Sequence, residues 1–211
     1  MLLWLSCLYS LSNRQTKTPS SHLLLSTPFQ VLSAWETAAE QGHALARLNI
    51  GLVYENGAGA EKDYKKAFEW YEKAAEQGLS AAENNLGVLF REGWGVKKDY
   101  KKAYALFEKA AGQGNFDAQT NLGDLYEHGK GVRLSVGTAK EWYEKAAEQG
   151  IAMAQFYLGL MCERGVGVDQ DDSMAMRWYA KAAAQGHERA QGRIGIIFAR
   201  RRKSMAGKGR K

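Results

Sequence analysis

The stretch Ala38-Ala39-Glu40-Gln41-Gly42 decides how this chain folds, because it recurs four more times at a constant interval. The pattern Ala-Ala-x-Gln-Gly returns at residues 74–78, 110–114, 146–150 and 182–186, so successive copies lie 36 residues apart. A fixed period of this length indicates a repeat array, in which each unit packs on its neighbours rather than around one central core. The sequence therefore predicts four whole units, residues 43–78, 79–114, 115–150 and 151–186, preceded by a half repeat at 29–42 and followed by a capping helix at 187–198.

Each unit carries the pattern of two helices joined by a glycine turn. In residues 79–114, Ala82, Leu86, Leu89 and Phe90 recur at the spacing i, i+4, i+7 and i+8, which places them on one face of an α-helix. A Gly-x-Gly turn follows, and its first glycine is expected to end the helix in the left-handed conformation. The aspartate or serine at positions 63, 99, 135 and 171 then stands where the second helix needs an N-cap.

A glycine interrupts the apolar face of each first helix, at positions 51, 87, 123, 159 and 195. An interior glycine costs about 1 kcal/mol relative to alanine, so its recurrence predicts a neighbouring helix too close for a Cβ atom. The second helices carry large aromatic residues and paired alanines, as at Trp142, Tyr143, Ala146 and Ala147. We expect Trp142 to lie between helices, so that its truncation to alanine costs about 3–5 kcal/mol.

The two ends of the chain differ from the repeats in composition. Residues 1–28 join an apolar stretch to a polar one, and we interpret them as an N-terminal extension that is disordered or a degenerate signal. The apolar stretch is too short to cross a bilayer, so no transmembrane segment is expected. The formal net charge of the chain is +6, and residues 199–211 hold seven basic residues and no acidic one. We interpret residues 199–211 as a basic disordered tail.

Residue types used in catalysis and metal binding are scattered rather than grouped. Cys7 and Cys162 lie in unrelated contexts and suggest neither a disulfide framework nor a metal-ligand cluster. His43 and His187 hold the same repeat position at opposite ends of the array, so they cannot converge on one metal. The Gly-x-Gly turns follow a helix and lack the third glycine of a dinucleotide fingerprint. We therefore expect no catalytic residues, no metal, no cofactor and no small-molecule substrate, and interpret the protein as non-enzymatic.

The combined pattern resembles the Sel-one-like repeat (SLR) family, a relative of the tetratricopeptide repeat. The units follow Ala-x3-Leu-Gly-x2-Tyr, then Gly-x-Gly-Val, then Asp-x3-Ala-x2-Trp-Tyr-x2-Ala-Ala-x-Gln-Gly, with departures in individual units. The resemblance covers residues 31–198 and implies an all-α fold, a right-handed α-solenoid of antiparallel helix pairs. It also implies an adaptor or scaffold role. Some members are secreted with a disulfide in every repeat, and those cysteine pairs are absent here, so the cytoplasm is favoured while export stays open.

Three functions follow as hypotheses. The first is a protein-interaction scaffold that binds a protein or peptide partner on the concave surface, which the first helices line in arrays of this kind. The second is association with nucleic acid or an anionic membrane surface through the basic tail, residues 199–211. The third is a hydrolase. It rests only on labels that some members of the resembled family carry, because the sequence supplies no nucleophile–base pair.

The partner-binding residues are expected on the part of the first helices that varies between units. Such variation suits contacts with different parts of a partner, and it also suits a surface under no constraint; its apolar content favours binding. The predicted residues are Leu52 in the first unit, Asn84, Val88 and Arg91 in the second, Thr120, Asp124 and Glu127 in the third, and Phe156, Leu160 and Glu163 in the fourth, with Leu48 and Glu55 completing the first.

Overall fold

The computed structural model describes residues 28–208, so the predicted N-terminal extension lies outside it apart from Pro28, which begins the first helix. Every regular element in that part of the chain is an α-helix. In chain order the helices are α2 (Pro28–Glu40), α3 (Ala44–Asn56), α4 (Tyr64–Ala75), α5 (Ser80–Glu92), α6 (Tyr100–Gly112), α7 (Phe116–His128), α8 (Val136–Glu148), α9 (Ala152–Arg164), α10 (Asp172–Ala183) and α11 (Glu188–Lys208).

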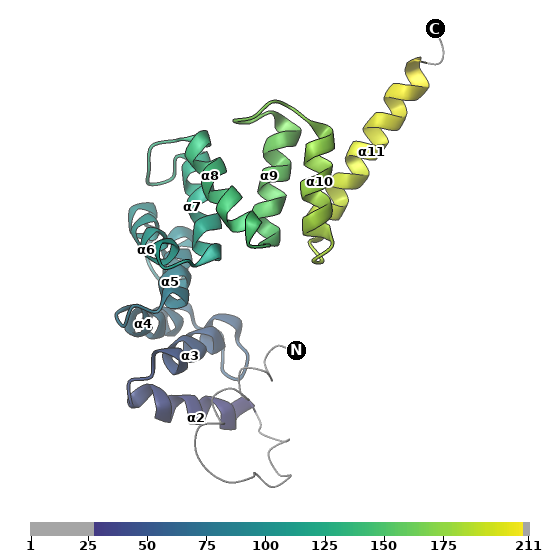
Figure 1. Cartoon of the computed structure of the whole chain (residues 1–211). Helices are drawn as coiled ribbons and strands as arrows, with labels where there is room; N and C mark the ends of the chain where they lie inside the picture. The colour runs from purple at the N-terminus through teal and green to yellow at the C-terminus, as the bar shows by residue number, and fades with distance from the viewer. Residues whose placement is uncertain (1–27, 209–211) are drawn as a thin grey trace.

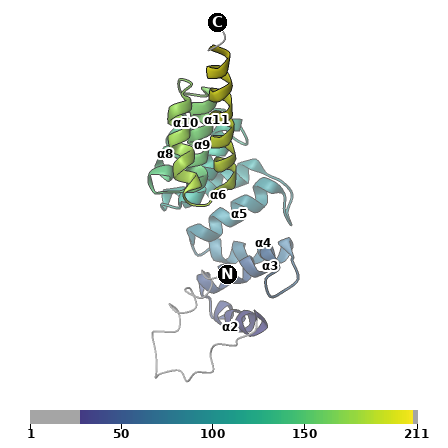
Figure 2. The same cartoon turned by 90° about the vertical axis from the view of Figure 1, so that its right-hand side faces the viewer.

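The helices form antiparallel pairs that stack along a curved path (Figure 1). α3 packs against α4, α5 against α6, α7 against α8 and α9 against α10, and the second helix of each pair packs on the first helix that follows. The chief neighbour of α2 is α3, and that of α11 is α10. Figure 2 shows the same stack from the side, with the pairs changing direction along it. The predicted fold class is confirmed: the protein is an all-α, right-handed α-solenoid.

The helix boundaries follow from capping residues. Asp63 has an extended backbone, and its carboxylate accepts hydrogen bonds from the backbone N–H groups of Lys65 and Lys66 (2.9 and 3.1 Å) at the start of α4. The equivalent aspartate or serine caps α6, α8 and α10. Gly57 ends α3 with a φ of 70°, in the left-handed region, and its equivalents end α5, α7 and α9. The predicted N-caps and left-handed glycines are therefore confirmed.

The interior glycine of each whole pair lies against an aromatic ring of that pair's second helix. A Cβ atom at Gly123 would stand 2.6 Å from Cδ1 of Tyr143, and one at Gly87 would stand 2.6 Å from Cε1 of Phe107. The glycines at positions 51 and 159 meet tyrosine rings in the same way. The close approach predicted from the sequence is confirmed for these four positions. Gly195 on α11 differs, because no atom lies within 4 Å of the place its Cβ would occupy.

Replacement of Gly123 by alanine is expected to destabilise the protein by about 1–3 kcal/mol, because the added methyl group must displace a buried ring. The matched change Gly195→Ala places the same group in open space, and should be neutral or stabilise by up to about 1 kcal/mol through helix propensity. Chemical denaturation of both variants measures the difference. Equal changes in the free energy of unfolding would contradict the assigned packing.

The aromatic residue buried between the helices is the tyrosine, not the tryptophan beside it. Tyr143 is fully buried, as are its equivalents in the other pairs. Trp142 is half-buried, and Nζ of Lys145 lies 4.3 Å from the centroid of its indole ring. Trp142 does pack against the apolar cluster of the neighbouring helices, as predicted, but it stays half-buried, and the ring that fills the space beside Gly123 is that of Tyr143. Consecutive residues point about 100° apart on a helix, so only one of the two aromatic neighbours can face the glycine of the first helix.

The Ala-Ala-x-Gln-Gly stretch lies at the end of each second helix, next to the start of the first helix of the same pair. Its first alanine is fully buried in every whole unit. Nε2 of Gln77 donates to the carbonyl oxygen of Gly42 (2.9 Å), just before α3, and Nε2 of Gln113 donates to Oε2 of Glu83 (2.7 Å) on α5. Gln185 makes the corresponding bond in the last pair. The glutamine thus ties the end of each of these second helices to the start of its own first helix.

The last helix is longer than the sequence pattern indicated. The prediction of a disordered tail from residue 199 is wrong for residues 199–208, because α11 continues without a break to Lys208. Two basic side chains of this segment bond back to the preceding pair. A terminal nitrogen of Arg200 lies 2.9 Å from Oε1 of Glu163, and one of Arg201 donates to Oγ of Ser173 (3.0 Å). Because these two side chains have partners within the chain, their contacts favour the continuation of α11 beyond residue 199.

Candidate protein-binding surface

The first helices line the inside of the curve, as Figure 1 shows most clearly for α3 and α5. One side of each packs on its second helix, and the residues on the opposite side recur at i, i+4, i+7 and i+11. These residues are exposed or half-buried, except Leu160, which is 9% exposed. We call this set the inner face. It comprises Leu45, Asn49, Leu52 and Asn56 on α3; Ala81, Asn85, Val88 and Glu92 on α5; Asp117, Asn121, Asp124 and His128 on α7; and Met153, Tyr157, Leu160 and Arg164 on α9.

The chemistry of the inner face changes along the array. Apolar side chains are exposed at both ends, with Leu45 on α3 and Met153 on α9. The middle is acidic, because Asp117 and Asp124 both lie on α7. Asp124 is paired within the chain, since Nζ of Lys130 lies 3.2 Å from its Oδ2. Asp117 is exposed at the start of the helix. The surface therefore offers different contacts at different units.

The structure places four of the predicted partner-binding residues on the inner face. Leu52, Val88 and Asp124 are half-buried there, and Leu160 holds the same register on α9. Each stands one residue after the interior glycine of its helix. This position lies beside the packed side of the helix rather than on it, so Leu52, Val88 and Asp124 reach the surface. Leu160 is instead buried in the core of the last pair, so its expected exposure is wrong.

Four other predicted residues are buried, and their expected exposure is wrong. They stand three residues before the interior glycine, and residues three apart share a face of the helix. They therefore point toward the packed side. Oδ1 of Asn84 accepts a hydrogen bond from Nδ2 of Asn121 on the next first helix (2.9 Å). The four buried residues are Leu48, Asn84, Thr120 and Phe156.

The predicted residues four positions after the glycine also point toward the second helix. Glu127 accepts a hydrogen bond from the hydroxyl of Tyr143 (2.9 Å). Burial, and then the charge of Glu127, raise the pKa of Tyr143 above its usual range. The hydroxyl therefore stays protonated and remains the donor of this bond. The other pairs of this kind are Glu55 with Tyr71 and Glu163 with Tyr179.

In the second unit, both members of this tyrosine–glutamate pair are replaced. Its buried ring is Phe107, which has no hydroxyl to donate, and the facing residue is Arg91 rather than a glutamate. The guanidinium carbon of Arg91 lies 5.8 Å from the centroid of the Phe107 ring. One terminal nitrogen of Arg91 also donates to Oδ1 of Asn121 (2.6 Å). The residue four positions after the glycine is thus glutamate where the buried ring is tyrosine, and arginine where the ring is phenylalanine. This correlation indicates that the residue has a structural role.

Glu163 holds α11 against the last pair. Its carboxylate accepts from Nε of Arg193 (2.8 Å) and from the hydroxyl of Tyr179 (2.7 Å), and Arg200 lies 2.9 Å away. The side chain of Glu163 is almost completely buried. Burial alone would raise the pKa of Glu163, but the hydrogen bonds from Arg193 and Tyr179 and the charges of both arginines outweigh it and hold the pKa below its usual range. Glu163 is therefore a packing residue rather than a surface for a partner.

Sequence reasoning missed the row of residues two positions before each glycine. This row reads Asn49, Asn85, Asn121 and Tyr157 on successive first helices. Both polar atoms of the Asn121 side chain bond to α5, because Nδ2 donates to Asn84 and Oδ1 accepts from Arg91. The ring of Tyr157 stacks on that of Tyr143 with centroids 4.9 Å apart. The signal was present in the sequence, because a residue two positions from the glycine must point to the opposite side of the helix.

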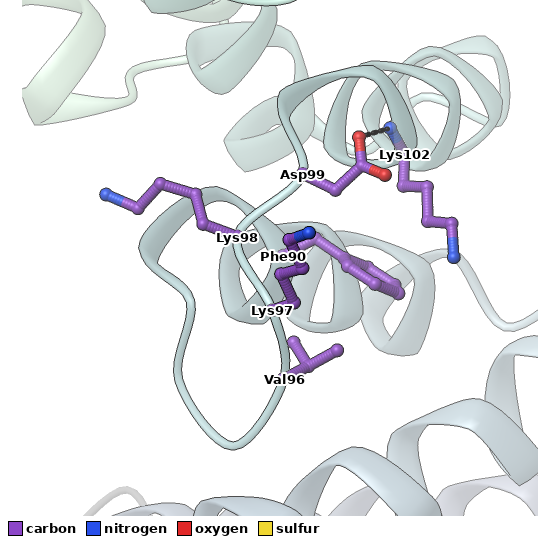
Figure 3. Close-up of a pocket in the computed structure, with 6 residues that line it drawn as sticks. All are labelled: Phe90, Val96, Lys97, Lys98, Asp99 and Lys102. Carbon is purple, nitrogen blue, oxygen red and sulfur yellow. Dashed lines mark hydrogen bonds between the residues drawn. The ribbon is translucent and has the colours of Figure 1, made fainter.

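A shallow hollow lies under the turn of the second unit, away from the inner face (Figure 3). Phe90, Val96, Asp99 and Lys102 line it together with Lys97 and Lys98, and the dashed line marks the bond from the backbone of Lys102 to the carboxylate of Asp99. A second hollow lies at the equivalent residues of the first unit. Since the two occupy the same register, they reflect the geometry of the repeated turn rather than a dedicated ligand site.

Across residues 28–208, no group of three or more histidine, cysteine, aspartate or glutamate side chains is arranged to hold a metal ion. Cys162 is buried, and burial raises the pKa of its thiol. No helix in the described part of the chain combines the length and apolar character needed to cross a membrane.

The chain is similar to known repeat proteins. The profile of the Sel1 repeat matches residues 44–79, 80–115, 116–151 and 152–187. No curated protein sequence gives a significant match. The solved structure of c5321, a protective antigen of uropathogenic Escherichia coli with an SLR fold, has 39% identity and a TM-score of 0.72 over 93% of this chain and 40% of that chain. A Sel1 repeat protein from Oxalobacter formigenes has 36% identity and a TM-score of 0.75 over 79% and 66%. The immunity protein Pa5087 from Pseudomonas aeruginosa has 26% identity and a TM-score of 0.58 over 89% and 67%.

The chain spans less than two thirds of the length of the first two of these proteins. Sel1 repeat proteins generally act as protein-interaction scaffolds and are typically non-enzymatic. The four matched repeats run without a gap through most of the chain and coincide with the stacked helix pairs. The protein therefore belongs to the Sel1 repeat family.

Proposed function

We propose that this protein is an interaction scaffold that binds a segment of a partner protein along its inner face. The observation that carries the proposal is the constant register of the inner face on four stacked helices, combined with side chains that differ from unit to unit. A constant register provides a continuous track, and different side chains allow each unit to contact a different part of the partner. Stacked helical repeats use extended concave surfaces in this way.

The side chains of the inner face favour a particular kind of segment. Leu45 and Leu52 at one end, and Met153 at the other, are suited to apolar anchors, because exposed apolar side chains tend to mark interaction sites. The exposed carboxylate of Asp117 between them favours lysine or arginine in the centre of the segment, because opposite charges steer a partner into register. We therefore propose a segment with apolar ends and a basic centre.

The other two hypotheses gain no specific observation. Arg200, which belongs to the predicted basic tail, pairs with Glu163 on α9 and Asp172 on α10, so its charge is partly neutralised within the chain. Arg201 donates to the hydroxyl of Ser173. The hydrolase hypothesis still lacks a nucleophile–base pair to rest on. The similar proteins are described as an antigen and as an immunity protein, so they support a shared scaffold and not a shared partner. We therefore propose neither alternative.

Affinity capture with matched variants tests the proposal. The inner-face variant Val88→Glu/Asp124→Lys changes two half-buried side chains on α5 and α7. The control variant Ala105→Glu/Glu141→Lys makes equivalent charge changes at exposed positions of the outer helices α6 and α8. We expect the control to retain every partner of the wild type, and the inner-face variant to lose at least tenfold in affinity for them, which is about 1.4 kcal/mol. Equal capture by both variants would mean that partners bind elsewhere.

A further inference from the structure

The face of α11 that carries Gly195 is open in the described part of the chain. Ile196 and Phe198 are large apolar side chains on this helix, with exposed fractions of 51% and 57%. In the whole units the register position of Phe198 is better covered, since Phe90 and Cys162 are each 8% exposed and Tyr54 and Tyr126 are half-buried. Gly195 itself has no atom within 4 Å of the place its Cβ would occupy. The register of Phe198, which is buried or half-buried in the whole units, is therefore exposed on α11, and the surface around Gly195 lacks the ring that covers it in those units.

The protein itself shows what covers this face elsewhere. In each of the four whole pairs, an aromatic ring of the second helix lies against the interior glycine of the first helix. This contact is an established interface that the chain repeats four times with one geometry. The same surface on α11 is thus shaped to receive a helix of the second type.

At the other end, α2 is a helix of the second type, and within residues 28–208 no first helix precedes it. Residues 31–42 align with residues 67–78, so α2 holds the register of α4. Ala34 on α2 is exposed, whereas its equivalents Trp70 and Trp142 are half-buried against apolar clusters that include their own first helices. Ala38 is half-buried, whereas the equivalent Ala74 is fully buried. At these two positions, the side of α2 that would meet a first helix is more open than in the whole units compared.

The two faces are also complementary in charge. Among the described residues, α2 carries Glu36 and Glu40, both exposed, and no basic residue. α11 is strongly basic, and Arg202 is exposed near its end. Opposite charges on the two ends attract, and like charges oppose contact between two copies of the same end.

We propose that this protein assembles head to tail, with α2 of one copy docked on the Gly195–Phe198 face of α11 of another. The two helices then form one further whole unit, built from two chains, that continues the solenoid. Such an interface joins two different surfaces, so each added copy presents a new free end and the assembly grows into open chains rather than stopping at a dimer. This inference is independent of the proposed binding along the inner face.

The test measures the mass of the full-length chain by sedimentation velocity over a wide concentration range. Phe198→Glu blocks the α11 face, Ala34→Glu blocks the α2 face, and Leu134→Glu is a control at an exposed apolar residue on the turn before α8. All three positions are exposed, so thermal melts should match the wild type. The wild type and the control should increase in mass with concentration, less so at high salt. Each blocked variant alone should remain a monomer.

The mixture of the two blocked variants is decisive. Each retains one competent face, so an equimolar mixture should form a dimer and nothing larger. Self-association of Ala34→Glu to the same extent as the wild type would overturn the proposal in favour of contacts between two α11 helices. A wild type that stays monomeric at every concentration would overturn it as well, and would assign the α11 face to a different protein or to another segment of this chain.

Discussion

Replacing Tyr143 with alanine is expected to lower the free energy of unfolding by about 3–5 kcal/mol. The ring is fully buried and lies against Gly123, where no side chain is available to fill the space it leaves. The change also removes the hydroxyl that bonds to Glu127. Since each unit is stabilised by its neighbours, the loss in one pair should weaken the pairs on either side of it.

The matched control for this prediction is the adjacent residue. Trp142→Ala removes a larger side chain that is only half-buried, and should cost about 1–2 kcal/mol. Tyr143→Phe keeps the ring and removes only the hydroxyl, at a cost of about 1 kcal/mol. Urea denaturation followed by circular dichroism measures all three. A larger loss from Trp142→Ala than from Tyr143→Ala would show that the wrong ring has been assigned to the space between the helices.

Glu163→Ala should have the next largest effect, about 2–3 kcal/mol. The change leaves Arg193 and Arg200 without their shared carboxylate and removes the acceptor of the Tyr179 hydroxyl. The expected decrease in the free energy of unfolding is smaller than for a fully buried ion pair, because both arginines reach solvent. Amide hydrogen exchange should rise most in α11. The control Glu148→Ala, at an exposed position of α8, should leave exchange in α11 unchanged.

The same carboxylate makes stability depend on pH. The pKa of Glu163 is held below its usual range in the folded protein. Its contribution is therefore present above about pH 4.3, the unfolded value, and is lost as the pH falls through the folded pKa. The difference in stability between the wild type and Glu163→Gln should shrink over that range. A difference that stays constant with pH, or exchange in α11 that matches the control, would contradict the assigned role of Glu163.

The sequence predicted those parts of the fold that depend on local rules. The 36-residue period, the capping aspartates and the left-handed glycines each act within one unit, so residue type and spacing suffice to place them. The close approach at Gly123 was also predictable, because only proximity explains a repeated glycine inside a helix. The family likewise follows from the repeated motif.

The errors concern the rotation of each helix about its axis. Trp142 and Tyr143 are both aromatic and adjacent, and nothing in the pattern of apolar residues distinguishes the ring that faces inward. Variation between units predicts that Asn84 and Glu163 lie on the surface. Both instead lie on the helix face that carries the interior glycine, where Asn84 bonds to the next first helix and Glu163 bonds to the ring hydroxyl of its second helix. Counting from the glycine would have separated these residues from Val88 and Asp124. The continuation of α11 depends on contacts between Arg200 and a residue 37 positions away, which a local pattern does not contain.

The most direct test of the proposed function is site-specific photo-crosslinking with a partner bound. A photoreactive amino acid is placed at Val88 on the inner face, and in a second sample at Ala105 on the outer helix α6. We predict that the probe at position 88 crosslinks to one defined segment of the partner, with apolar ends and a basic centre, and that the probe at position 105 gives no crosslink. Crosslinks at position 105, with none at position 88, would contradict the assignment of the inner face as the binding surface.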